Sequence, residues 1–276
     1  MQQGFITEDE YKQAYGEELV FKSSIRNVGV QDYYADLLIQ DVIDDLMEKY
    51  GYSENYATNM VYFGGLRIES AEVLSQQEKV ESIYANDANF PAPLKNDKEN
   101  PQGAILIMDY DGRVVATAGG RGEKTANRIA NRATQSVRQP GSSMKPIGVY
   151  GPAIEMNKIH YSSLFEDAPI TYDGIKWPPN YSNTDGNKAW TFRDYTVVDA
   201  LQRSLNTVPA QIITGQLGLK TSFDFAVNKF HLSTLVTSRQ VPVAGGYNTV
   251  TDLTPSGLAL GGLTDGVKCI DMAAAY

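Results

Sequence analysis

The sequence is poor in the residues that build disulfide frameworks and metal centres. Its 276 residues include one cysteine, Cys269, and two histidines, His160 and His231. A single cysteine excludes a disulfide within the chain, and neither histidine belongs to a ligand motif, so we expect no metal site. We predict that Cys269 is a small buried side chain on a helix and that the histidines are structural or surface residues.

Long apolar runs and clusters of basic residues are also missing. The longest apolar run, Ala104–Met108, is far shorter than the ~20 residues that span a bilayer, and the chain opens without a signal-peptide pattern. We therefore expect any membrane anchor to lie outside this chain. The net charge is −9 with scattered lysines and arginines, which argues against a nucleic-acid surface. The hydrophobic content of 42% is enough for a folded core.

Helix signals dominate the first sixty or so residues, and the pattern changes from Gly64. Thr7 and Glu10 make a capping box, and Gly51 is placed to end a long amphipathic helix. The predicted elements are helices over 32–49 and 75–84, a strand over 64–70, and a polar linker over 87–101.

Two β-rich runs, 104–109 and 113–118, flank Asp111-Gly112, which is a strong hairpin signal. A two-stranded hairpin is marginal in water by itself, so we expect further strands to complete a sheet. We divide the chain into a helical region over 1–63, a linker with a strand and a helix over 64–100, and a larger domain over 101–276.

The stretch QPGSSMK, Gln139–Lys145, is the first candidate for chemistry. Its Pro-Gly turn starts a helix, and Ser142 and Lys145 then lie three residues apart on one helix face. A capped helix with a solvated lysine explains the same residues equally well. The motif itself carries little information, because a chain of this length contains roughly one S-x-x-K by chance. More groups must therefore converge before the stretch indicates an active site.

A serine nucleophile needs a base, and a lysine serves only if burial or nearby cations lower its pKa from ~10.4. A helix N-terminus disfavours the ammonium form and offers N–H groups to an oxyanion. Ser204 and Asn206, in DALQRSLNTVPA, would add a hydroxyl and a carboxamide. The same S-x-N spacing occurs at Ser53-Glu54-Asn55, where we expect Ser53 to be a helix cap.

The surroundings of these motifs closely resemble the transpeptidase domain of class A penicillin-binding proteins. The resemblance runs through GAILIMDYDGRVVATAGG, ANRATQSVRQPGSSMKPIGVYGPAIE, KWPPNYSNTDG, DALQRSLNTVPA and LALGGLTDGVKCIDMAAAY. Upstream, QQGFITEDEYKQA is similar to the end of the family's glycosyltransferase domain, and GGLRIESAEVLSQQ to its interdomain linker. Glu69-Ser70-Ala71-Glu72 departs from the threonine-rich turn of that linker.

The resemblance implies a role for each matching residue, from the family's S-x-x-K and S-x-N motifs. The implied roles are Ser142 as the acylated nucleophile, Lys145 as its base, Ser204 as the proton relay, Asn206 as the partner of the substrate amide, and Trp177 and Asn180 as residues lining the substrate cleft. For Trp177 and Asn180, packing in the cleft wall explains their positions equally well.

The family's third motif, K-T-G, has no counterpart. Lys124-Thr125-Ala126 precedes the nucleophile, and in Lys220-Thr221-Ser222 we expect Thr221 to be a helix N-cap. We therefore expect the domain to be incomplete at Tyr276, with K-T-G on a downstream segment or a second chain.

The implied fold is α/β (α+β), of the serine D,D-transpeptidase and β-lactamase type. It has a mainly antiparallel sheet packed with helices, a helical subdomain, and a mostly helical linker before it. The implied activity is cross-linking of peptidoglycan stem pentapeptides that end in D-Ala-D-Ala, at the outer face of the bacterial cytoplasmic membrane. It implies acylation by β-lactams and no cofactor. A β-lactam sensor or inactive scaffold, and a serine β-lactamase, are the alternatives.

Overall fold

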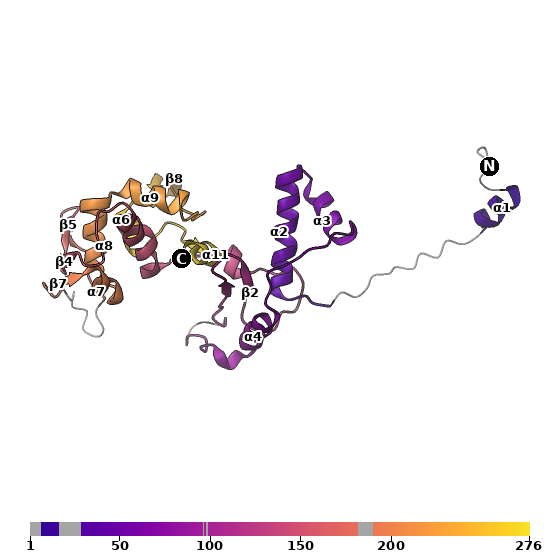
Figure 1. Cartoon of the computed structure of the whole chain (residues 1–276), viewed down its shortest axis with the longest axis horizontal. Coiled ribbons are helices and arrows are strands. Elements are labelled where there is room, and N and C mark those ends of the chain that lie inside the picture. Colours follow the sequence, from indigo (N-terminus) through magenta and orange to yellow (C-terminus); the bar gives the residue numbers. More distant parts are fainter. Residues whose placement is uncertain (1–6, 17–28, 96, 98, 182–189) are drawn as a thin grey trace.

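The computed structural model describes residues 7–16, 29–95, 97, 99–181 and 190–276. In Figure 1, α2, α3, α4 and β2 form one lobe, α6 to α9 form another, and α11 lies between them. The helices are α1 (Glu8–Gly16), α2 (Tyr33–Tyr50), α3 (Glu54–Phe63), α4 (Leu74–Ala85), α5 (Arg132–Gln135), α6 (Gly151–Glu155), α7 (Val197–Gln202), α8 (Thr207–Ile212), α9 (Leu219–Asn228), α10 (Pro255–Leu260) and α11 (Cys269–Ala275), with 3₁₀ turns η1 (Asp87–Asn89) and η2 (Gly141–Ser143) and π-helical turns η3 (Pro146–Tyr150) and η4 (Ile213–Leu217).

The strands are short and pair in antiparallel twos. They are β1 (Ile105–Met108), β2 (Val114–Ala118), β3 (Val137–Arg138), β4 (Leu164–Glu166), β5 (Ile170–Tyr172), β6 (Ile175–Trp177), β7 (Asp194–Thr196), β8 (Arg239–Val243), β9 (Gly246–Val250) and β10 (Val267–Lys268). The pairs are β1–β2, β3–β10, β4–β7, β5–β6 and β8–β9. The predicted class, helices with antiparallel strands, is confirmed. In the described part of the chain, no helix has the length and apolar character needed to cross a membrane.

The helix signals near the start of the chain are confirmed. The Thr7 N–H donates to the Glu10 carboxylate at 2.7 Å, and the Glu10 N–H donates back to the Thr7 hydroxyl at 3.3 Å. Asp32 caps α2, which ends at Gly51 in a left-handed conformation with φ 67°. Ser53 caps α3, as predicted. The capping side chains at the starts of these helices accept hydrogen bonds from backbone N–H groups that the helix itself leaves without partners.

The predicted hairpin forms, and helices cover it. β1 and β2 pair antiparallel with a register shift between Ile107 and Met108. Ala116 and Ala118 of β2 pack against Tyr33 of α2 and Val80 of α4 in a small apolar core. Among the described residues, the hairpin is a two-stranded sheet, and α2 and α4 bury the face that we expected further strands to stabilise.

The strand predicted over 64–70 is wrong. No strand is assigned there, and Leu66 and Ile68 are exposed. Gly65 turns the chain at φ 69°, and the first backbone hydrogen bond to the hairpin comes only at Val73, whose N–H donates to the Val115 carbonyl at 2.9 Å. An alternating pattern becomes a strand only where a partner edge pairs with it.

Two local predictions in the C-terminal half are also wrong. Thr221 lies inside α9, and Gly218, with φ 85°, occupies the cap position. Cys269 is exposed because it begins α11 directly after β10, where the first turn faces a surface cavity that Met272 also lines. His160 and His231 are exposed, as predicted for surface residues.

The second lobe is built around the helical segment that begins at Gly141. The segment passes from η2 through η3 into α6, and it buries Met144, Ile147 and Val149. These side chains share one apolar core with residues of α8, α9 and α10, such as Leu258. Gly148 lies so close to the Leu258 carbonyl that a Cβ at this position would overlap it. The close approach fixes the direction of the helix that carries the QPGSSMK residues.

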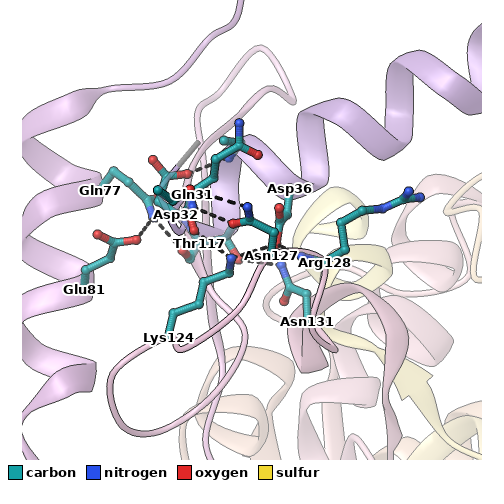
Figure 2. Close-up of polar contacts among 12 residues, drawn as sticks. Gln31, Asp32, Asp36, Gln77, Glu81, Thr117, Lys124, Asn127, Arg128 and Asn131 are labelled. Carbon is teal, nitrogen blue, oxygen red and sulfur yellow. Dashed lines mark hydrogen bonds and ion pairs between the residues drawn. The ribbon is translucent and has the colours of Figure 1, made fainter. Parts of the chain in front are cut away.

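A buried ion pair ties α2 to the loop between the hairpin and α5 (Figure 2). Lys124 Nζ lies 2.8 Å from the Asp36 carboxylate, and the side chains are only 7% and 8% exposed. Lys124 also donates to the Gln31 carbonyl at 2.6 Å, and the Arg128 N–H donates to Asp36 at 2.5 Å. A buried charge without an opposite charge beside it raises the free energy of the folded state. Separating Lys124 from Asp36 is therefore unfavourable, and the pair holds α2 against this loop.

We predict that Asp36→Ala lowers the free energy of unfolding by about 3–5 kcal/mol, because it leaves the Lys124 ammonium buried without its counter-charge. Chemical denaturation gives the loss, and native-state hydrogen exchange of the α2 amides localises it. The control is Asp224→Ala, which breaks the exposed pair with Lys220 and should cost less than about 1 kcal/mol. Equal losses in the two variants would contradict the assignment.

Candidate active site

The QPGSSMK turn is held from both sides by the segment that follows α10. The Gln139 side chain donates to the Leu263 carbonyl at 2.6 Å and accepts from the Leu263 N–H at 2.7 Å. Gly141 adopts φ 56°, and Gly261, with φ 73°, packs directly on its backbone. A side chain at position 261 would overlap Gly141, so the turn requires glycine there.

The two adjacent serines of the turn differ in their partners. The Ser143 hydroxyl donates to the Pro140 carbonyl at 2.7 Å, and the Ser143 carbonyl accepts from the Tyr276 hydroxyl at 2.8 Å. Ser142 is exposed, and its hydroxyl makes no hydrogen bond to any residue that the structure describes. Of the two, only Ser142 presents an unengaged hydroxyl at the start of the helix.

Lys145 lies at the centre of the arrangement, with only 1% of its surface exposed. Its Nζ donates to the Ser204 carbonyl at 2.7 Å, the Ser204 hydroxyl at 3.0 Å and the Asn206 Oδ1 at 2.7 Å. Three acceptors match the three N–H groups of an ammonium. Burial lowers the pKa of Lys145 from 10.5 to about 8, so roughly a tenth of the amine is neutral at pH 7. The resemblance implied a Ser142–Lys145 pair, but the Lys145 hydrogen bonds go to the S-x-N turn.

The S-x-N turn joins α7 to α8 in a strained conformation. Ser204 has φ 52°, in the left-handed region that non-glycine residues rarely adopt. This conformation lets the Ser204 carbonyl and hydroxyl both reach Lys145. Backbone strain of this kind persists only where surrounding contacts hold it, and it is concentrated at functional sites.

The two residues expected to line the cleft lie in different environments. Asn180 is buried, and its Oδ1 accepts the Asn206 N–H at 2.8 Å. Trp177 is half-buried at the end of β6, with its ring 5.8 Å from the ring of Tyr172. The structure therefore joins Asn180 to the S-x-N turn, whereas the described ring contact of Trp177 is with the neighbouring strand.

Sequence reasoning missed Asp167, which lies directly after β4 and is fully buried. Its carboxylate accepts hydrogen bonds from Asn180, Thr191 and Thr207. Burial alone would raise the pKa of Asp167, but these hydrogen bonds outweigh it and hold the pKa below its usual value. No motif marks this aspartate, because its partners become neighbours only in the folded chain.

The site thus combines a free serine hydroxyl at a helix N-terminus with a buried lysine of lowered pKa, a second hydroxyl and a carboxamide. These are the components of a serine–lysine acyl-transfer centre. Among the described residues, no three His, Cys, Asp or Glu side chains are grouped to hold a metal.

Comparison with known proteins agrees with a serine–lysine acyl-transfer centre, because residues 103–275 match the family model described as penicillin binding protein transpeptidase domain. The chain belongs to this family, as the transpeptidase domain of a class A penicillin-binding protein.

Similar proteins include penicillin-binding protein 1A of two Clostridium botulinum strains. The protein of strain Hall is 30% identical to this chain over 233 residues, which cover 81% of this chain and 28% of the relative. The protein of strain Langeland is 31% identical over 237 residues, with the same coverage. The chain therefore spans just over a quarter of these relatives. The solved structure of the penicillin-binding protein PonA1 from Mycobacterium tuberculosis has a TM-score of 0.60 at 22% identity, over 88% of this chain and 56% of that one.

We predict that Gly261→Ala lowers the free energy of unfolding by about 1–3 kcal/mol more than Gly51→Ala does. Both glycines have positive φ, at 73° and 67°, but a Cβ at Gly51 meets no atom within 4 Å, whereas at Gly261 it overlaps Gly141. The difference between the two variants in chemical denaturation isolates the steric part. Equal losses would mean that the turn can move away from position 261.

Proposed function

We propose that this chain carries the D,D-transpeptidase centre of a peptidoglycan synthase, with Ser142 as the nucleophile. The observation that carries the proposal is the buried amine of Lys145, which is hydrogen-bonded to Ser204 and Asn206. Lys145 lies on the same helical segment as Ser142, whose hydroxyl is free. Its pKa of about 8 makes a neutral amine available to accept a proton near physiological pH.

The first half of the reaction is acylation. Neutral Lys145 accepts the Ser142 hydroxyl proton while Oγ attacks the carbonyl of the penultimate D-Ala in a stem peptide. The backbone N–H of Ser142, at the start of the helix, donates to the oxyanion and stabilises it. The C–N bond then breaks, and a proton passed from Lys145 through Ser204 reaches the amine of the leaving D-Ala. An ester on Ser142 remains, and Asn206 supports the substrate amide throughout.

The second half transfers the acyl group to an amine of a neighbouring stem peptide. That amine attacks the ester, its proton returns through the same groups, and Ser142 regains its hydroxyl as the cross-link forms. Lys145 must release at least one of its three resting contacts for this chemistry, since a neutral amine has two N–H groups and one lone pair. In acylation this lone pair faces the Ser142 hydroxyl, and the Ser204 hydroxyl accepts from Nζ. In the transfer step the Ser204 hydroxyl donates to Nζ instead, and so carries the proton of the attacking amine back to Lys145.

The similarity to penicillin-binding proteins 1A supports a wider setting for the centre. We place it in a bifunctional synthase that also carries a glycosyltransferase and acts at the outer face of the bacterial cytoplasmic membrane. The substrate is then the stem pentapeptide ending in D-Ala-D-Ala. β-Lactams are mimics of that terminus and acylate the same serine.

We predict that a fluorescent penicillin labels Ser142 alone in the full-length protein. Ser142→Ala should abolish the label, whereas Ser143→Ala, which removes only the hydroxyl bonded to Pro140, should keep it. Peptide mapping by mass spectrometry locates the adduct. A label on Ser143 or Ser204 would overturn the assignment, and rapid turnover of nitrocefin would identify a β-lactamase. Stable labelling without turnover of stem-peptide substrates would favour a sensor.

We predict that acylation accelerates as pH rises and levels off above about 8, the pKa of Lys145. Below that value Lys145 is protonated and cannot accept the serine proton, so the rate should fall by about tenfold per pH unit. Stopped-flow acylation from about pH 6 to about pH 10 measures the profile. A flat profile over this range would exclude Lys145 as the base.

A further inference from the structure

The buried carboxylate of Asp167 lies behind the S-x-N turn and is fixed by the elements around it. Its Oδ1 accepts from the Asn180 side chain at 2.6 Å and the Thr207 hydroxyl at 2.6 Å. Its Oδ2 accepts from the Thr191 N–H and hydroxyl, both at 2.9 Å. Gln211 of α8 donates to the carbonyls of Glu166 and Ala168 on either side, at 2.8 and 2.9 Å.

An ionised carboxylate only accepts hydrogen bonds, and this property sets the orientation of Asn180. The Asn180 amide must turn its NH₂ group towards Asp167, so its oxygen faces the other way. That oxygen accepts the backbone N–H of Asn206 at 2.8 Å. Asp167 also holds the Thr207 hydroxyl, directly after Asn206 in the chain. The carboxylate thus anchors the end of the S-x-N turn through two independent contacts.

The Asn206 side chain completes the connection to the reacting groups. Its NH₂ donates to the Pro179 carbonyl at 2.8 Å, which leaves its oxygen to accept from Lys145 at 2.7 Å. Pro179 precedes Asn180, so Asn206 makes both contacts to one loop, and the Asp167–Asn180 hydrogen bond ties that loop to the residue after β4. The series Asp167, Asn180, Asn206 and Lys145 contains one hydrogen bond at each step.

We propose that Asp167 is a positioning residue of the transpeptidase centre and acts through Asn180 to hold the Asn206 carboxamide in place. Asn180 is accordingly a positioning residue too, in place of the substrate contact that the resemblance implied. The inference rests on the proposed function. It predicts a loss of acylation rate when Asp167 changes, because a carboxamide displaced by a fraction of an ångström no longer supports the substrate amide or the amine of Lys145.

The contribution of Asp167 is one of geometry. The lowered pKa of Lys145 has burial as its cause, so removing the Asp167 charge should leave the pH midpoint of acylation in place. The maximum rate at high pH should fall instead. This combination separates a positioning residue from a group that tunes the base.

The test uses the full-length protein, acylated by a fluorescent penicillin in stopped flow. Asp167→Ala and Asn180→Ala should each reduce the acylation rate by about 10²-fold, and the double variant should reduce it by far less than the product of the two effects, because both remove the connection from Asp167 through Asn180 to Asn206. Asp167→Asn, with a smaller change in shape, should reduce it by about 10-fold and preserve the pH midpoint. In each variant the fraction of protein finally labelled should remain that of the wild type.

The matched control is Asp36→Asn, which neutralises a buried carboxylate of the other lobe. It should lower stability without lowering the acylation rate of the folded protein. The inference is overturned if Asp167→Asn and Asn180→Ala reduce only the labelled fraction or the melting temperature. It is also overturned if the rate effects of Asp167→Ala and Asn180→Ala multiply in the double variant. If the wild type itself fails to label at Ser142, it is the proposed function that fails.

Discussion

Burial of the Lys145 amine is the constraint on which the site depends. An ammonium with 1% of its surface exposed persists only if its hydrogen bonds are satisfied, and a neutral amine is favoured as soon as they weaken. Both forms need acceptors or donors in fixed places, and the S-x-N turn supplies them. The positive φ of Ser204, the orientation of Asn206 and the buried Asp167 all follow from this need. The energetic cost of each is offset by the contacts that it makes possible.

The rest of the chain fixes the helix that carries this amine. Gly148 and Gly261 admit the close approaches that set its direction and the shape of its first turn. The hairpin lobe reaches the same region through the loop that Lys124 and Asp36 pin to α2. α11 packs against β1, α5 and β10, and so connects the two lobes next to the nucleophile turn. Small residues therefore fix the helix that carries Ser142, whereas the Asp36–Lys124 pair stabilises the hairpin lobe.

Local signals in the sequence predicted local structure well. The caps at Thr7 and Ser53, the end of α2 at Gly51 and the β1–β2 hairpin depend on neighbours within a few residues, and they form as expected. The strand over 64–70 needed a partner edge, which no local pattern reveals. The exposure of Cys269 depends on what packs against the first turn of α11, which the local sequence does not specify. Predictions that depend on distant partners failed because periodicity describes one face of a segment and not its neighbour.

The site residues illustrate the same division. The motifs named Lys145, Ser204 and Asn206, and the fold brings them together at hydrogen-bonding distances. The motifs also paired Ser142 with Lys145, whereas the resting amine bonds to the turn opposite. Asp167 carries no motif, and its partners lie 13 to 40 residues away in sequence. Only the folded chain could reveal it.

The contacts that frame the nucleophile turn also have a consequence for synthesis on the ribosome. Gln139 meets Leu263 across 124 residues, and Ser143 meets Tyr276 across 133. Such distant contacts form late, after the entropy of closing a long loop has been overcome. A nascent chain that has exposed Ser142 lacks the segments that shape its turn until more than a hundred further residues have emerged. The turn that carries the proposed nucleophile, Ser142, is therefore expected to form late in folding, after the surrounding core.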